Sequence, residues 1–360
     1  MTAPRRLLLT AALAGVTALS LSACASSEDS GSSGGGSGPA ASAASSATLA
    51  AGEGCTLEQT GYPKLDLKTA KVGFSQSEPE SAPFRVAETQ SIKDEAAKLG
   101  IPSGNLITTN ANAQLSKQIA DIQDMLAQGV QALIVAPLNS DGLEPALSAA
   151  KAKKVPVVTI DRKVNAAACT DYLTFIGSNF VDQGKRAADA MIKETGGTGK
   201  VAILLGSSGN NVTTDRTSGF VDQVKAEAPG LEIVAQQTGD FARDKGQQVM
   251  EQLIQANPDI TAVYAENDEM GLGAMTALTA AGKNPGKDVK IVSIDGTRNA
   301  VQAIVAGTYN AVIESNPRFG PLAFQTLQQF EDGQAIPNDV IISDGEYDSS
   351  NAADKVNDAF

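Results

Sequence analysis

Polar and charged side chains that can bind hydroxyl groups recur in this sequence directly after short apolar runs. Asp161 and Arg162 follow an apolar run at 156–160, and Asn267 comes shortly after another at 262–265. Carboxylates, amides and guanidinium groups can each hydrogen-bond two neighbouring hydroxyl groups. This spacing therefore predicts a site for a sugar. Further candidates of the same kind are Arg85, Arg216 and Asp295, with Glu80, Asp240 and Glu314 as secondary candidates.

Phe84 and Phe241 stand among these polar residues and are the predicted aromatic contacts. The chain has ten Phe, five Tyr and no Trp, so few aromatic rings are available to a binding site. An aromatic ring packs on the apolar C–H face of a sugar while polar groups bind its hydroxyls. Phe84 directly precedes Arg85, and Phe241 directly follows Asp240. We therefore expect both rings to line the ligand site.

A purely structural explanation exists for each of these polar residues taken alone. Asp and Asn after strands commonly cap helices or form turns. This explanation does not account for the whole set, because Arg162 and Arg216 are not capping residues. The set as a whole favours a binding site.

The absence of histidine excludes several classes of enzyme and metal site. Histidine is the commonest general base in catalysis and the commonest metal ligand, and this chain has none. A Ser-His-Asp or Cys-His arrangement is therefore impossible, and a zinc site of nitrogen and sulfur ligands is disfavoured. We expect no metal and no cofactor. The net charge of −13 disfavours binding to the phosphate backbone of a nucleic acid.

A glycosidase is the enzymatic alternative that the sequence leaves open, because such an enzyme needs only two carboxylates. Nearby arginines favour binding over catalysis, since their charge keeps carboxylates ionised rather than able to donate a proton. A dinucleotide enzyme is disfavoured, because the Gly-Leu-Gly run at 271–273 lacks the third glycine of the fingerprint. The carboxylates that could form a glycosidase pair are Asp161, Asp240, Asp268 and Asp295.

Short apolar runs alternate with helical patterns from residue 70 onward. The runs are rich in Val and Ile, with apolar residues in succession, as in strands buried on both faces. Apolar stripes at 115–126 and 92–99 have the spacing of amphipathic helices. This alternation predicts an α/β fold with two lobes, each a parallel sheet flanked by helices, and a ligand cleft at the carboxyl ends of the strands. The predicted strands are 71–75, 132–136, 156–160, 173–176, 200–205, 232–235, 262–265, 290–294 and 309–313.

Residues 1–24 have the features of a secretory leader. Two arginines precede an apolar stretch at 7–21, which ends in small residues. The run Leu-Ser-Ala-Cys at 21–24 resembles the bacterial lipobox, which implies cleavage after residue 23 and a lipid on Cys24. An ordinary signal peptide with an incidental cysteine is the alternative. Residues 24–54 are mostly Ser, Gly and Ala and predict a disordered tether.

Cys55 and Cys169 are the cysteines that remain once a lipid occupies Cys24. An oxidising compartment favours one disulfide between two remaining cysteines. Two free buried thiols are the alternative. The disulfide would tie the start of the folded body to a segment more than a hundred residues further along the chain.

Several segments of the chain resemble the ribose-binding-like (type I) family of periplasmic binding proteins. They are VPVVTIDR (155–162), TTDRTSGF (213–220), GDFARDKGQQVM (239–250), VYAENDEMGLGAM (263–275), VSIDGTRNAV (292–301) and AVIESNP (311–317). VGFSQ (72–76), AET (87–89), GDF and ESNP are most similar to the galactofuranose-binding branch of the family. The chain departs from the family at Ala82, where ribose binders carry Asn, and at Phe84, where the galactofuranose branch carries Trp.

The resemblance implies two α/β lobes that are joined by three crossovers and close on a sugar. The implied lobes are 55–177 with 316–340, and 178–315 with 341–360. The resemblance also assigns ligand contacts to the polar candidates and places Phe84 and Phe241 at aromatic contact positions. The residues assigned in this way are Phe84, Arg85, Asp161, Arg162, Arg216, Phe241, Asn267 and Asp295.

We therefore expect a sugar-binding component of an ABC importer, without enzymatic activity, that lies outside the cytoplasm and is anchored to the membrane by lipid on Cys24. Its partners would be a monosaccharide and a membrane permease, and we expect a monomer. A sugar-sensing partner of a membrane receptor is the alternative. A transcription regulator of the same fold is excluded by the leader and by the lack of a basic helix-turn-helix segment.

Overall fold

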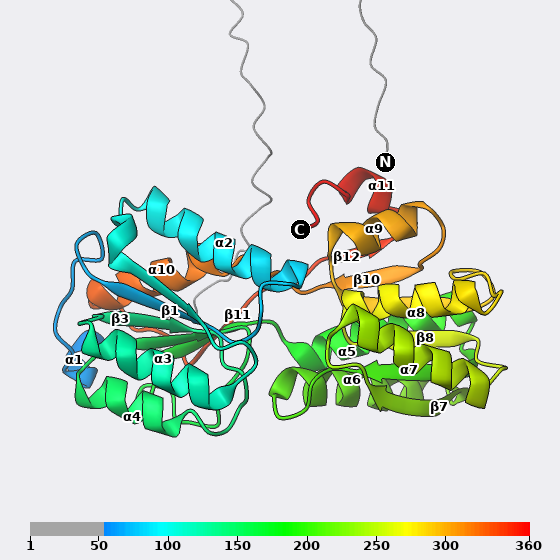
Figure 1. The fold of residues 1–360 in the computed structure, drawn as a ribbon, viewed down its shortest axis with the longest axis horizontal. Helices are drawn as coiled ribbons and strands as arrows, with labels where there is room; N and C mark the ends of the chain where they lie inside the picture. Colours follow the sequence, from blue (N-terminus) through cyan, green and yellow to red (C-terminus); the bar gives the residue numbers. More distant parts are fainter. Residues whose placement is uncertain (1–53) are drawn as a thin grey trace, which may run out of the picture. The chain divides into compact units, whose positions relative to one another are not determined.

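The computed structural model describes residues 54–360. The predicted leader at 1–23, the predicted lipid site at Cys24 and nearly all of the predicted tether at 24–54 lie outside the described residues. Two six-stranded sheets organise the described part of the chain (Figure 1). The predicted α/β fold of two sheets flanked by helices is confirmed.

The first sheet is entirely parallel, in the order β11-β5-β4-β3-β1-β2. Every residue of β1, β3, β4 and β5 is buried, as their mostly apolar sequences predict. The sequence does not predict β2, because this edge strand reads Leu-Ile-Thr-Thr-Asn and is only half-buried. The strands are β1 (Val72–Gln76), β2 (Leu106–Asn110), β3 (Ala132–Val135), β4 (Val157–Ile160), β5 (Thr174–Gly177) and β11 (Asp339–Ile341).

The second sheet has the order β12-β10-β9-β8-β6-β7. Its strands are parallel except β12, which pairs antiparallel with β10. All five predicted strands of this half of the chain are present, and β12 is an addition of three residues. The strands are β6 (Thr198–Leu205), β7 (Gly230–Thr238), β8 (Ala262–Ala265), β9 (Lys290–Asp295), β10 (Ala311–Glu314) and β12 (Glu346–Asp348).

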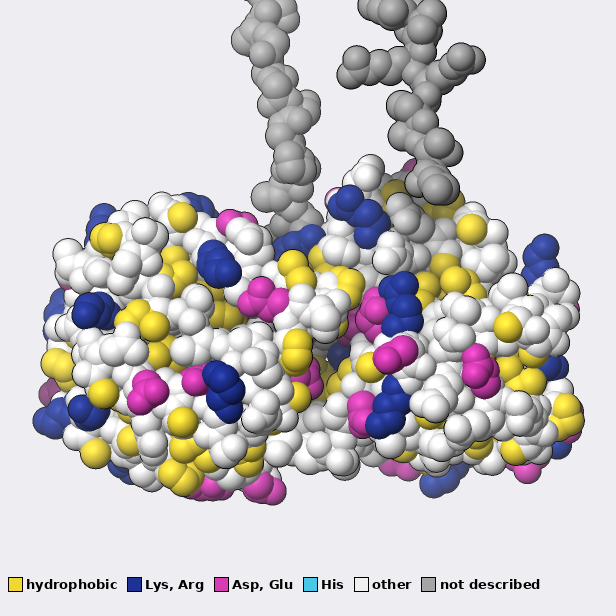
Figure 2. Space-filling model, in the orientation of Figure 1, with side chains coloured by type: hydrophobic (Ala, Val, Ile, Leu, Met, Phe, Trp, Pro, Cys, Tyr) yellow, Lys and Arg dark blue, Asp and Glu magenta, His cyan; other side chains and the backbone are white. Residues whose placement is uncertain are grey.

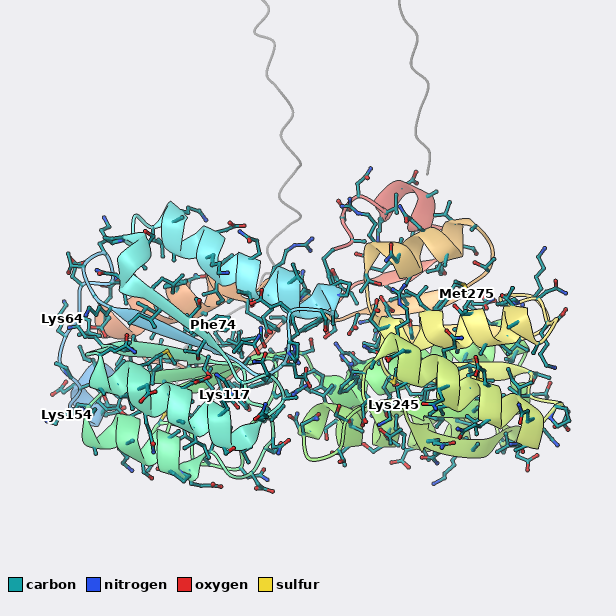
Figure 3. The ribbon with its side chains drawn as sticks, in the orientation of Figure 1. Lys64, Phe74, Lys117, Lys154, Lys245 and Met275 are labelled. Carbon is teal, nitrogen blue, oxygen red and sulfur yellow. A yellow bond between two sulfur atoms is a disulfide. The ribbon has the colours of Figure 1, made fainter. Side chains whose placement is uncertain are left out.

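Helices cover both faces of each sheet. In the first lobe α2 and α10 pack on one face, where Phe74 of β1 is fully buried, and α3 and α4 pack on the other (Figure 3). In the second lobe α5 and α6 cover one face, and α7, α8 and α9 cover the other. The helices are α1 (Leu57–Thr60), α2 (Pro83–Lys98), η1 (Ser103–Asn105), α3 (Leu115–Ala127), α4 (Glu144–Ala152), α5 (Phe180–Thr195), α6 (Asn211–Glu227), α7 (Arg243–Ala256), α8 (Asp268–Ala280), α9 (Arg298–Val305), α10 (Gly320–Glu331) and α11 (Ala352–Lys355).

Three segments connect the two lobes, as the fold prediction requires. The first connection runs from β5 to α5, the second from β10 to α10, and the third from β11 to β12. They lie beside one another: the Ile342 N–H donates to Gly177 O at 3.0 Å, and the Glu314 N–H donates to Gly345 O at 3.0 Å. A change in a few backbone dihedrals at these connections could therefore move one lobe relative to the other.

A disulfide joins Cys55 and Cys169, as predicted. Cys55 also pairs with Ile336 through two backbone hydrogen bonds of 2.9 Å, and its side chain is buried in the first hydrophobic core. The bridge spans 114 residues of chain. It therefore ties the start of the described chain to the loop between β4 and β5.

Replacing both cysteines, Cys55→Ser with Cys169→Ser, is expected to lower the free energy of unfolding by about 2–4 kcal/mol, because the unfolded chain loses its cross-link. Urea unfolding with and without a reducing agent measures the effect. The wild-type protein should lose stability on reduction, whereas the double variant should not respond. Equal stability of the two proteins under oxidising conditions would contradict the prediction.

Candidate functional site

A cavity of about 900 Å³ lies between the lobes at the carboxyl ends of the strands. Side chains from both lobes line it, and oppositely charged groups stand side by side along the boundary (Figure 2). The structure brings together all eight of the primary candidates, together with Asp240. The predicted residues that line the cavity are Phe84, Arg85, Asp161, Arg162, Arg216, Asp240, Phe241, Asn267 and Asp295.

Arg85 is the centre of a buried charge cluster in the first lobe. It lies in the first turn of α2, is 5% exposed, and bonds three carboxylates. Its Nη1 donates to Asp161 Oδ2 at 2.7 Å and to Glu88 Oε2 at 2.8 Å, and its Nε donates to Glu78 Oε2 at 2.9 Å. These contacts fix the guanidinium at the wall of the cavity.

Arg162 shares Glu78 with Arg85. Its Nη2 lies 3.0 Å from each oxygen of Glu78, and its Nη1 donates to Leu138 O at 2.9 Å. Its guanidinium carbon lies 5.9 Å from the ring centroid of Phe241, which belongs to the second lobe. Arg162 therefore contacts residues of both lobes.

The pKa values of the two glutamates in this cluster are shifted in opposite directions. Burial raises the pKa of Glu78, but Arg162 and Arg85 outweigh burial and lower it to about 2. Burial dominates at Glu88 despite Arg85 and raises its pKa to about 7. Glu78 is therefore a permanent anion at the cavity wall, whereas Glu88 lies behind it, fully buried, and changes charge near neutral pH.

Arg216 is the corresponding cation of the second lobe. It lies on α6, is 3% exposed, and its Nη1 donates to Glu266 O at 2.6 Å. Its Nε donates to Gln183 Oε1 at 3.0 Å, and Nη1 lies 3.8 Å from Asp295 Oδ1. Burial raises the pKa of Asp295 well above its usual value, although Arg216 opposes the shift.

Two of the strand-end aspartates adopt backbone conformations that are rare outside glycine. Asp161 follows β4 with φ 65°, and Asp295 ends β9 with φ 144°. Such conformations cost about 1–3 kcal/mol each and concentrate at functional sites. They direct two buried carboxylates to one cavity from opposite lobes.

Asn267 combines the two explanations that the sequence leaves open. Its side-chain oxygen accepts from the Met270 N–H at 3.0 Å and so caps α8. Its Nδ2 donates to Phe241 O at 3.1 Å, and the residue also lines the cavity. Asn267 therefore both caps α8 and lines the cavity.

Phe84 and Phe241 line the cavity from opposite lobes. Phe84 packs edge-on against Phe360, with ring centroids 5.9 Å apart. Two hydrogen bonds also join the lobes beside the cavity: the Ser140 N–H donates to Gly209 O, and the Lys163 N–H donates to the side chain of Asn211, both at 2.9 Å. The two lobes are therefore in direct contact beside the cavity.

Two secondary candidates do not line the cavity. Glu80 is exposed on the loop before α2. Glu314 lies at the second connection, where its carboxylate accepts from the Gly345 N–H at 2.8 Å. Asp240 does line the cavity and pairs with Lys245 of α7, which Figure 3 labels.

The sequence-based prediction missed several polar residues of the cavity wall. Glu78 is the most important, because it holds both Arg85 and Arg162. Arg243 and Glu269 form a two-bond ion pair at 2.7 and 2.8 Å. Asp and Glu in the loops after strands indicate that such residues exist, but the sequence does not show which carboxylate contacts an arginine. The missed residues include Glu78, Asn139, Ser207, Ser208, Arg243, Asp244, Gln247 and Glu269.

No group of three or more Cys, Asp or Glu side chains within residues 54–360 has an arrangement that could hold a metal ion. The buried carboxylates of the cavity are instead paired with arginines. What the arrangement can do chemically is to present hydrogen-bond donors, acceptors and aromatic faces to a ligand enclosed between two lobes.

The family model described as "Periplasmic binding protein domain" matches residues 72–335, nearly three quarters of the chain. The chain belongs to the periplasmic binding protein family. Members of this family are solute-binding proteins rather than enzymes, and they act outside the cytoplasm. The predicted family and the coarse location of this periplasmic binding protein are therefore confirmed.

The curated relatives and solved structures that resemble this periplasmic binding protein include binders of furanose sugars. It is 36% identical to the galactofuranose-binding protein YtfQ of Escherichia coli (strain K12) over 76% of this chain and 85% of the relative. It is 34% identical, with a TM-score of 0.76, to the arabinose-transporter binding protein of Shewanella sp. ANA-3 bound to α- and β-L-arabinofuranose, over 81% of this chain and 95% of that one. A Mycobacterium smegmatis structure in complex with β-D-fucofuranose is 36% identical, with a TM-score of 0.75, over 80% of this chain and 93% of that one.

Proposed function

We propose that this protein captures a neutral monosaccharide in its furanose form and delivers it to an ABC permease, and that it has no enzymatic activity. The observation that carries the proposal is the cavity in which paired arginines, aspartates and two phenylalanines converge from both lobes. The similarity to proteins that bind galactofuranose, arabinofuranose and fucofuranose supports a furanose. The eight primary residues are the proposed ligand contacts, with Asp240 and Glu78 beside them.

The charge of the cavity wall supports a ligand without net charge. Arg85, Arg162 and Arg243 each contact a carboxylate of the protein, so none of them is a free cation for an acidic sugar. Asp161 would repel a ligand carboxylate or phosphate at short range. Hydroxyl groups, in contrast, can accept from the arginines and donate to the aspartates.

Titration calorimetry with D-galactose, L-arabinose, D-fucose and D-ribose tests this function. Each sugar contains its furanose form in solution, and methyl furanosides and methyl pyranosides separate the two ring forms. We expect a neutral furanose to bind and D-galacturonate to bind at least about a hundredfold more weakly, because an unpaired charge in a dry cleft keeps its desolvation cost. Binding of galacturonate as tightly as galactose, or of no sugar in the set, would contradict the proposal.

We further propose that the two lobes, 55–177 with 316–340 and 178–315 with 341–360, open and close about the three connections. Ile341 pairs with Gly177 in the first sheet, so the third connection begins after residue 341, one residue later than the sequence-based bound. Closure is expected to require the ligand, because only the closed form lets one sugar contact both lobes. We expect the protein to act as a monomer.

We also propose that a lipid on Cys24 holds the protein at the membrane. The support is the leader at 1–23 and the lipobox-like run at 21–24, which lie outside the described residues. Among residues 54–360, no helix combines the length and the apolar character needed to cross a membrane. A tether of about 30 residues, from 24 to 54, would let the lobes meet a permease.

The change Cys24→Ala is expected to release the protein from the membrane fraction or to block its maturation, because a lipid needs the thiol. Fractionation followed by mass spectrometry of the mature amino terminus measures both outcomes. Cys169→Ser is the matched control: it removes a cysteine of the folded body and should leave the protein at the membrane. Normal processing and full membrane retention of the Cys24→Ala variant would refute the anchor.

A further inference from the structure

A buried glutamine links the cavity to the connections between the lobes. Gln183 lies near the start of α5, is 1% exposed, and accepts from the Nε of Arg216 at 3.0 Å. Its Nε2 donates to Asp344 Oδ2 at 2.8 Å and to Glu314 O at 3.2 Å. A glutamine amide has two N–H donors, so one faces each of these acceptors. Gln183 thus touches a cavity arginine and two of the three connections, and its own helix follows the third.

The local packing holds Gln183 in this position. Asn179 caps α5 through the Asp182 N–H, which sets the first turn of the helix directly after the first connection. α5 and α6 then approach very closely, because a Cβ on Gly184 would lie 2.4 Å from Arg216 O and one on Gly219 would lie 2.2 Å from Val181 O. Any larger residue would push the helices apart, so these glycines bring Gln183 within hydrogen-bond distance of Arg216.

Arg216 depends on Gln183 for its orientation. The described residues supply acceptors to Nε and Nη1, through Gln183 and Glu266 O, and they supply none to Nη2. Nη2 thus remains for a hydroxyl group of the ligand, at a position that the other two contacts determine. Loss of the Gln183 contact would let the guanidinium rotate about its remaining bond to Glu266.

We propose that Gln183 is a positioning residue that couples sugar binding at Arg216 to the arrangement of the three connections between the lobes. The inference rests on sugar binding in the cavity. Opening of the lobes about the three connections would move Glu314 and Asp344, which lie on two of them and accept from the Gln183 amide. Gln183 cannot keep both of these bonds and its bond to Arg216 if the acceptors move apart. By linkage, a sugar that holds Arg216 favours the arrangement of the connections in which all three bonds are made.

Exchange of backbone amide hydrogens in the ligand-free full-length protein tests the coupling without relying on a sugar. Gln183→Met keeps the volume of the side chain and removes all three bonds. We expect peptides that cover the connections (177–180, 314–320 and 341–346) to exchange at least about fivefold faster in this variant, because local opening becomes easier.

Gln118→Met is the matched control. Gln118 is also fully buried and bonds Ala136 O and the Leu138 N–H, but it lies in the first lobe on α3, away from the connections. We expect it to lower stability without faster exchange at the connections. Unchanged exchange in Gln183→Met, or equal acceleration in Gln118→Met, overturns the proposal. Absence of sugar binding to the wild-type protein would refute the proposed function but leave this test intact.

Gln183→Glu supplies a second test if Gln183→Met fails to fold. At pH 8 the new carboxylate still accepts from Arg216, but it has no N–H for Glu314 O and faces the carboxylate of Asp344. The other charges around this point are the Glu314 carboxylate and Arg186, which donates to Asp344 O and Gly345 O and lies 3.7 Å from Glu346. Burial raises the pKa of Asp344 to about 6, so a proton can enter between the two carboxylates on acidification.

The ligand for this test is the sugar that the wild-type protein binds in calorimetry. We expect Gln183→Glu to bind it about tenfold more weakly than the wild-type protein at pH 8. At pH 5.5 the loss should shrink to about threefold or less, because the shared proton restores a bond to the third connection. Equal losses at both pH values would indicate a structural role alone and would overturn the coupling.

Discussion

Asp295→Ala is expected to weaken sugar binding by about ten- to a hundredfold without destabilising the ligand-free protein. The residue is 4% exposed, and the nearest cation to its carboxylate is Arg216, at 3.8 Å. A ligand hydroxyl that loses its hydrogen-bond partner in a dry cleft costs about 1–3 kcal/mol, which corresponds to this loss of affinity. Calorimetry gives the affinity, and urea unfolding gives the stability of the ligand-free protein.

The pH dependence of stability follows from the direction of the Asp295 pKa shift. Burial raises this pKa in the folded protein, so ionisation is disfavoured there relative to the unfolded chain. The penalty is absent below the unfolded pKa of about 4 and grows as the pH rises toward the folded value. Asp295→Ala should therefore match the wild-type stability at pH 4 and equal or exceed it at pH 8.

Asp268→Ala is the matched control for Asp295. Asp268 is also fully buried, but its carboxylate accepts from the Gly296 N–H, the Thr297 N–H and hydroxyl, and the Ser293 hydroxyl, at 2.5–3.0 Å. Its removal orphans these donors and should lower the free energy of unfolding by about 2–4 kcal/mol. If Asp295→Ala instead destabilises the protein as Asp268→Ala does and keeps its affinity, Asp295 is a structural residue.

Arg85→Met is expected to have the largest effect on stability, about 3–5 kcal/mol, because Glu88 loses its paired cation and Glu78 and Asp161 keep only Arg162. Arg85 contacts Glu78, Glu88 and Asp161, and its side chain is 6% exposed. Loss of this contact should also abolish measurable sugar binding, since Asp161 would no longer be oriented. Lys193→Met, which breaks the ion pair of an exposed lysine with Asp348, should leave the stability almost unchanged.

The sign of the pH effect in Arg85→Met distinguishes charge from packing. Burial already raises the pKa of Glu88 to about 7 with Arg85 present, and removal of the arginine raises it further. A raised folded pKa means that stability falls as the pH rises through it. Arg85→Met should therefore recover part of its stability between pH 8 and pH 5.5, and the additional change Glu88→Gln should recover part of it at pH 8. A pH-independent loss would indicate that packing alone is at stake.

The order of the strands along the chain was predictable from local sequence. Runs such as Val157–Ile160 and Ala262–Ala265 are apolar or β-branched throughout and are buried at every position. The edge strand Leu106–Asn110 was not predictable in this way, because its outer position lets Thr and Asn remain half-buried. The three-residue strands Asp339–Ile341 and Glu346–Asp348 are too short for any period to appear.

The residue types of the cavity were also predictable, because parallel strands bring their carboxyl ends to one edge of each sheet. Asp161, Asn267 and Asp295 follow strands in the sequence, and all three line the cavity. Glu78 and Glu80 lie in one loop, and the sequence does not show which of them meets the arginines. The structure places Glu78 between Arg85 and Arg162 and leaves Glu80 exposed.

What the sequence alone determined is therefore the fold class, the family, the pairing of Cys55 with Cys169 and the strand ends from which ligand contacts would come. These follow from local periodicity, from motifs and from a count of cysteines, none of which needs a distance. The tertiary structure alone decided which polar and charged side chains meet. Gln183 meets Arg216 from 33 residues away and Asp344 from 161 residues away. Such contacts depend on how two helices pack and how three connections lie together, because hydrogen bonds form over about 3 Å and carry no period along the chain.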